Sequence, residues 1–171
     1  MSSYREIVTK AIIGKAKKNI NSSFEVSPEQ VPNTVLGCWV INHEFNGSIS
    51  NKEALVNGSY DINIWYSYDN DTKTAVSTKR VSYQDKIKVN ANGSDKIDNN
   101  SEIIVRSLKQ PSVVEVNIEN GLVKLKTENE MGVEIVGNAK VKVNVEDDFD
   151  EYEEVLDDDI DNINEDYLEQ K

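Results

Sequence analysis

The stretch Tyr60-Asp-Ile-Asn-Ile-Trp-Tyr-Ser-Tyr68 decides the fold class of this chain. Its large apolar side chains, at positions 60, 62, 64, 66 and 68, alternate with Asp61, Asn63, Trp65 and Ser67. Residues two apart share a face of a β-strand, so the pattern predicts a strand with one face in the core and one polar face in water. Trp65 lies on the polar face, where an exposed tryptophan is a candidate interface anchor.

The same alternation recurs from residue 35 to residue 145. We expect further strands at 36–45, 81–89, 103–108, 114–118, 122–126, 131–136 and 139–145. Asn-Gly pairs at 46–47, 57–58, 92–93 and 120–121, with Gly-Asn at 137–138, predict turns between them. No helix-length pattern separates the strands. The sequence therefore predicts an all-β body over residues 25–145, an antiparallel β-sandwich or jelly-roll-like fold.

The N-terminal segment 1–24 shows a different pattern. Within residues 4–20, the side chains of Tyr4, Ile7, Val8, Ala11 and Ile12 fall at the spacing of one helical face. Ser3 and Glu6 have the spacing of a capping box. We therefore predict one amphipathic N-terminal helix, whose apolar face serves self-assembly.

Residues 146–171 form an acidic tail. The chain has 171 residues and a net charge of −12; the tail holds 14 of its 31 acidic residues and one of its 19 basic residues, so residues 1–145 carry a net +1. Such a tail is expected to be disordered when free. It has two interpretations: a solubilising segment, or a short helix that folds into an apolar groove on a partner. The stripe that supports the second interpretation is Leu156, Ile160, Ile163 and Tyr167, with Leu168 beside it.

The composition excludes several classes of protein. A near-neutral body lacks the basic footprint of a duplex-DNA-binding domain, so no nucleic-acid partner is expected. No run approaches the 18 apolar residues or more of a membrane span, so no direct membrane insertion is expected. The first residues lack the apolar core of a signal peptide, which indicates synthesis and retention in the cytosol.

The sequence contains few candidate catalytic or metal-binding residues and no recognisable catalytic motif. Its one cysteine, Cys38, excludes a disulfide scaffold and a multi-cysteine metal site. The one histidine, His43, lies five residues away, so on a regular strand the two side chains point to opposite faces, and we expect a buried cysteine and a surface histidine rather than a catalytic pair. Gly-x-Ser-x-Gly, Gly-x-Gly-x-x-Gly and Walker motifs are absent. We expect no enzyme, no cofactor and no specific metal site.

Three blocks of the sequence resemble one known family. Tyr4-Arg-Glu-Ile-Val-Thr-Lys-Ala-Ile12, Leu36-Gly-Cys-Trp-Val-Ile-Asn-His43 and Tyr60–Tyr68 are similar to the CotE family of outer spore coat morphogenetic proteins of endospore-forming bacteria. The similarity continues through shorter blocks in the same order, into an acidic tail.

The resemblance implies a structural role. Members of that family form a scaffold in the mother-cell cytoplasm around the developing spore, self-associate into a layer that becomes part of the outer coat, dock on a coat basement-layer protein and recruit outer coat proteins. The resemblance implies self-assembly through the N-terminal helix and body, where strand alternation makes Trp65 the candidate anchor, and partner binding through the tail, where helical spacing gives the stripe at 156, 160, 163 and 167. Members of the Bacillus type have cysteines where this chain has Ser22 and Val113, which leaves Cys38 as the one candidate for an intermolecular disulfide. The alternative is a carbohydrate-binding β-sandwich module that attaches the coat to glycan, with Trp65 as the platform.

Overall fold

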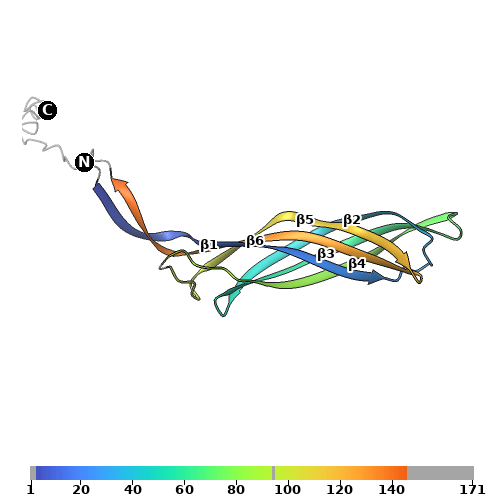
Figure 1. Ribbon diagram of the computed structural model, residues 1–171, viewed down its shortest axis with the longest axis horizontal. Helices are drawn as coiled ribbons and strands as arrows, with labels where there is room; N and C mark the ends of the chain where they lie inside the picture. Colours follow the sequence, from blue (N-terminus) through green and yellow to red (C-terminus); the bar gives the residue numbers. More distant parts are fainter. Residues whose placement is uncertain (1–2, 94, 146–171) are drawn as a thin grey trace, which may run out of the picture. The chain divides into compact units, whose positions relative to one another are not determined.

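The computed structural model describes residues 3–93 and 95–145, which form six β-strands and no helix. The tail that we predicted to be disordered lies outside these residues. The strands are β1 (Ser3–Val26), β2 (Thr34–Ser50), β3 (Glu53–Tyr68), β4 (Lys73–Ile87), β5 (Glu102–Glu119) and β6 (Leu122–Val145), as Figure 1 shows. The all-β prediction is confirmed.

The strands form two three-stranded sheets, in the orders β1-β6-β5 and β2-β3-β4. Strand β3 pairs antiparallel with β2 on one side and with β4 on the other, and β5 pairs antiparallel with β6. By contact, the chain divides into one compact unit over Val8–Ala139 and a second that, among the described residues, comprises Ser3–Ile7 and 140–145. The sandwich described below belongs to Val8–Ala139.

Side chains join the two sheets at the middle and at both edges. The Tyr60 hydroxyl of β3 is hydrogen-bonded to Thr127 Oγ1 of β6 at 2.9 Å. At one edge Lys18 of β1 forms a 3.0 Å ion pair with Asp85 of β4. At the other edge Val105 of β5 packs directly on Gly47 of β2, and β2 and β5 also lie side by side in Figure 1.

The core follows the alternation that the sequence predicted for Tyr60–Tyr68. Tyr60, Ile62, Ile64 and Tyr66 are at most 1% exposed, and they pack with Val26, Val81, Val123 and Leu125. Trp65, on the opposite face, is 43% exposed. Full burial of each large apolar side chain contributes about 1.5–3 kcal/mol, so this layer is a principal source of stability for the sandwich.

The predicted N-terminal helix is wrong, because residues 3–26 form strand β1. Two features of the sequence favour the strand: the run contains β-branched Ile7, Val8, Ile12 and Ile13, and it is interrupted by Gly14. Gly14 packs so closely on the segment that follows β4 that a Cβ there would lie 2.7 Å from Val89 Cγ1. The buried or half-buried residues farther along β1 alternate as in a strand: Ile20, Ser22, Phe24 and Val26.

Three of the five predicted turns are also wrong. The pairs at 46–47, 57–58 and 137–138 lie inside β2, β3 and β6, so the strands are fewer and longer than the sequence suggested. Their glycines leave room for side chains from other strands: Val105 over Gly47, Tyr83 over Gly58 and Ile13 over Gly137. The turn at Asn120-Gly121 is confirmed, with φ of 53° and 76°, and Gly93 also has a positive φ of 55°.

Candidate assembly surface

The outer face of the β2-β3-β4 sheet carries an exposed apolar surface. Trp39 and Trp65 are each 43% exposed, and Val76 is 54% exposed. Register places Trp65 between Gly37 of β2 and Val76 of β4. A Cβ at Gly37 would lie 3.8 Å from Trp65 Cε3 and 4.0 Å from Trp39 Cζ3, so both indoles flank this one glycine. We call Gly37, Trp39, Trp65 and Val76 the tryptophan surface.

Polar residues on the same face hold the sheet beside this surface. Asn63, opposite Trp39, is 9% exposed and accepts a 2.6 Å hydrogen bond from the Thr78 hydroxyl. One register step farther, Arg80 pairs with Asp61 at 3.4 Å and donates a 3.1 Å hydrogen bond to Ser59 Oγ. These contacts fix neighbouring strands, so the tryptophan surface rests on an ordered base.

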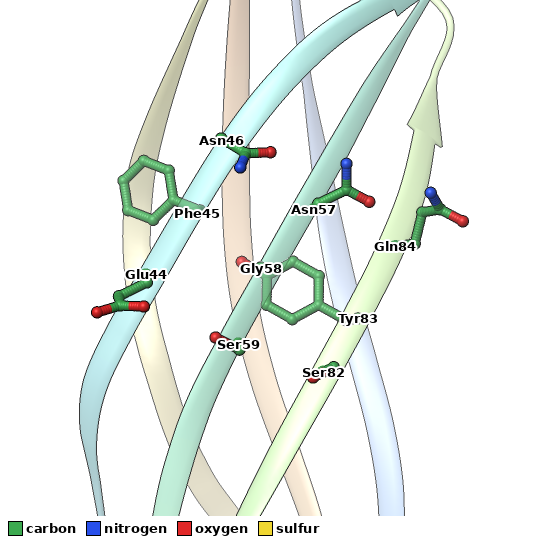
Figure 2. Close-up of a pocket in the computed structure, with 9 residues that line it drawn as sticks. All are labelled: Glu44, Phe45, Asn46, Asn57, Gly58, Ser59, Ser82, Tyr83 and Gln84. Carbon is green, nitrogen blue, oxygen red and sulfur yellow. The ribbon is translucent and has the colours of Figure 1, made fainter.

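Farther along the face, two polar rows cross the three strands, as Figure 2 shows. Glu44, Ser59 and Ser82 form one row, and Asn46, Asn57 and Gln84 form the other. They border an open hollow of about 530 Å³, which Phe45, Gly58 and Tyr83 also line. Strand alternation puts the two rows on the face opposite Tyr83. Carboxylate, hydroxyl and amide groups in such rows offer both donors and acceptors to an extended polar ligand.

His43 is half-buried on the inner face of β2, so its predicted position on the strand surface is wrong. A bulge between Ile41 and Glu44, with Asn42 at a φ of 57°, adds a residue to β2 and turns His43 to the inner face, the face on which Cys38 also packs. His43 Nδ1 lies 3.2 Å from Gln110 Oε1, and Nε2 lies 2.7 Å from the Tyr83 hydroxyl. Because the amide oxygen can only accept, Nδ1 carries the proton and Tyr83 donates to Nε2.

Burial shifts the pKa values in this inner group. Desolvation lowers the pKa of His43 from 6.5, against a smaller opposite effect of the Gln110 hydrogen bond. Desolvation, helped by the neighbouring Tyr60 phenol, raises the pKa of Tyr83 to about 12. The His43 imidazole and the Tyr83 phenol are therefore both neutral at pH 7, and each is hydrogen-bonded to another side chain of the sandwich.

A family model described as Outer spore coat protein E (CotE) matches residues 3–170, nearly the whole chain. The chain belongs to the CotE family. No curated protein and no solved structure matches it. Membership of the CotE family makes it a spore coat protein and confirms the resemblance found in the sequence.

In this CotE-family chain the predicted N-terminal assembly residues lie on strand β1. Tyr4, Ile7, Val8 and Ile12 are 68%, 43%, 67% and 42% exposed, and Ala11 is half-buried. On a strand, odd and even positions point to opposite faces, so these residues cannot form the single stripe that a helix would give. Their role in assembly stays a prediction. The predicted partner-binding stripe, residues 156–168, lies outside the described residues.

Cys38 of β2 is half-buried and packs against the core cluster. Desolvation raises the pKa of its thiol above 9.0, which keeps the sulfur protonated at neutral pH. Cys38 is paired in register with Ile64, whereas His43 contacts Tyr60 and Tyr83. The structure therefore does not bring the sulfur and the imidazole together as a nucleophile and its base.

The residues 3–93 and 95–145 contain no group of three or more side chains suited to holding a metal ion. Within the same residues there is no helix of the length and apolar character needed to cross a membrane. Sequence reasoning found Trp65 but did not assemble the tryptophan surface, because the pairing of Gly37 with Trp65 depends on register. It missed the His43 group because the bulge at Asn42 has no clear signal in the sequence.

Proposed function

We propose that this protein is a structural morphogenetic scaffold of the spore coat and not an enzyme. It is made in the mother cell, self-assembles into a layer around the forespore, docks on a coat basement-layer protein and recruits outer coat proteins. The tryptophan surface is the observation that carries the self-assembly. Membership of the CotE family supports the place of action.

The size of the tryptophan surface suits a weak, repeated contact. If two copies met through it, the four indoles would bury about 100 Å² each, worth about 10 kcal/mol at 25 cal/mol per Å². Association itself costs about 4–15 kcal/mol. The surface alone therefore supports concentration-dependent association, and a stable layer needs further contacts from each copy.

Light scattering across a concentration series tests this proposal. We expect the mass of the full-length protein to rise with concentration, and the variant Trp39→Ser/Trp65→Ser to need at least a tenfold higher concentration for the same mass. Val31→Ser is the matched control, because Val31 is 73% exposed and lies outside the strands. Equal assembly of the tryptophan variant and the control would contradict the proposal.

The tail stripe is the proposed site for recruited proteins. A full-length variant with serine at positions 156, 160, 163 and 167 keeps the acidic charge but loses the apolar stripe. We expect it to keep the association that depends on the tryptophan surface and to lose capture of outer coat proteins in a pull-down. Capture at the wild-type level would exclude the stripe as the binding element.

A second candidate function is glycan binding by the same outer face. The observation that favours it is the succession of two exposed indoles and two polar rows along β2-β3-β4, a pattern suited to stacking and hydrogen bonding with sugar rings. β-1,4-linked N-acetylglucosamine oligosaccharides should then quench the tryptophan fluorescence, and Trp65→Ala should reduce the effect. Unchanged fluorescence at saturating oligosaccharide would eliminate this function.

A further inference from the structure

The outer face of the other sheet, β1-β6-β5, carries a groove with an apolar floor. It has a volume of about 360 Å³. Leu108 of β5 is 51% exposed and lies across Gly132 of β6, where a Cβ would be 2.9 Å from Leu108 Cδ1. A side chain at position 132 would therefore displace Leu108. Ala16 and the buried Val133 also line the groove, and all of these residues lie in the unit Val8–Ala139.

The rim of this groove is basic. Lys15 of β1 and Arg106 of β5 both reach Glu134 of β6, with Lys15 Nζ and Arg106 Nε at 3.7 and 3.5 Å from Glu134 Oε1. Lys17 is exposed and forms no ion pair with the residues that the structure describes. Three cations and one carboxylate thus line the groove, which carries a net +2. We call these eight lining residues, 15–17, 106, 108 and 132–134, the basic groove.

We propose that the basic groove binds the acidic segment 153–169 of a neighbouring copy of this chain. This segment has nine acidic residues and no basic one, and its aliphatic and aromatic residues recur at 156, 160, 163 and 167. An apolar stripe flanked by carboxylates matches an apolar floor flanked by Lys15, Lys17 and Arg106. Both the charge and the apolar character of the groove are therefore complementary to the segment.

The contact would join copies head to tail. Each copy has one groove and one acidic segment, so the interface is heterologous and leaves a free groove and a free segment at the two ends of every assembly that does not close into a ring. The inference rests on the proposed scaffold function, for which it supplies a second contact beside the tryptophan surface. The two contacts lie on different sheets, so they can be removed separately.

Charge reversal on full-length chains tests the contact. The groove variant is Lys15→Glu/Lys17→Glu/Arg106→Glu, and the tail variant is Asp157→Lys/Asp158→Lys/Asp159→Lys. Both carry Trp39→Ser/Trp65→Ser, so that association through the tryptophan surface does not contribute. Sedimentation is measured for each variant alone, for their mixture, and for one chain with both reversals. The control is Lys52→Glu/Lys73→Glu/Lys86→Glu, three exposed lysines outside the groove.

The parent is the chain with Trp39→Ser/Trp65→Ser alone, and the control also carries these two substitutions. We expect the groove variant and the tail variant, each measured alone, to associate at least tenfold more weakly than the parent. The control should associate as the parent does. The mixture should form heterodimers, because one chain supplies an intact groove and the other an intact tail. The chain with both reversals should regain association, since its net charge equals that of the parent and the two signs are exchanged.

Three results would overturn the proposal. A mixture that stays monomeric would mean that a chain binds its own tail or that the tail is not bound. Equal losses of association for the groove variant and the control would indicate general charge repulsion, and unchanged association of Leu108→Ser would exclude a contact with the apolar floor. None of these results alters the outcome of the tryptophan-surface experiment, so the scaffold proposal is judged separately.

Discussion

Replacing Gly58 by alanine tests whether close packing decides the stability of strand β3 at this position. Tyr83 lies across Gly58, and a methyl group there would be 2.5 Å from Tyr83 Cε1 and closer still to Cζ and Oη. The ring must move, and its hydroxyl then loses the 2.7 Å contact with His43 Nε2. Gly58 has no positive φ, so its backbone does not itself exclude alanine.

The magnitude follows from these contacts. Overpacking in a filled interior costs about 1–3 kcal/mol, and the lost hydrogen bond about 1 kcal/mol more. Gly58→Ala should therefore lower the free energy of unfolding by about 2–4 kcal/mol. Strand propensity alone predicts the opposite sign, because alanine is favoured over glycine in a strand interior by about 0.5–1 kcal/mol.

Urea unfolding at a concentration where the chain is monomeric measures the effect. Gly37→Ala is the matched control in the same sheet: its Cβ would make only ordinary contacts, at 3.8 and 4.0 Å, so this variant should be as stable as wild type or up to about 1 kcal/mol more stable. In a Tyr83→Ala background, Gly58→Ala should cost nothing. A loss of equal size with and without the Tyr83 ring would refute the reasoning.

Three further predictions concern ionisable side chains. Because the pKa of His43 is lowered in the folded state, the unfolded chain binds the proton first as the pH falls below 6.5. Wild type should therefore lose more free energy of unfolding than His43→Gln between about pH 7 and pH 5. Equal pH dependence of the unfolding free energy in the two proteins would contradict this. One tyrosine should titrate in the absorbance of tyrosinate near pH 12 and be missing in Tyr83→Phe; its stabilising effect is present below pH 10 and lost as the pH rises toward 12. Cys38 should react slowly with a disulfide reagent until the chain is unfolded, because its thiol is half-buried and protonated; fast reaction, with assemblies that dissociate in reductant, would support the predicted intermolecular disulfide.

The inner strand face and the family could be read from the sequence because both depend on local information. Alternation over Tyr60–Tyr68 fixes which side chains point into the core wherever the strand is placed, since successive side chains point to opposite faces. It does not fix exposure on the other face, which was predicted to lie in water but where Asn63 and Ser67 are 9% and 4% exposed. The blocks that resemble the CotE family are likewise linear, and the family match over residues 3–170 confirmed them. The same alternation predicts that Trp65 lies on the exposed face, and it is 43% exposed.

Tertiary structure was needed to decide how long the strands are and whether residues 3–26 form a helix or a strand. It was also needed to find the tryptophan surface and the basic groove. A glycine such as Gly58 has the same local signature in a turn and beneath a packed ring, and only the approach of Tyr83 from another strand distinguishes them. Residues 4–20 fit a helical face by spacing, but pairing within the β1-β6-β5 sheet gives the backbone hydrogen-bond partners along its edge, and β1 forms instead. Local patterns in the sequence were enough for an all-β body, membership of a spore coat family and an exposed Trp65. Which distant residues meet depends on tertiary structure, because register and bulges bring together positions whose spacing along the chain carries no periodic signal.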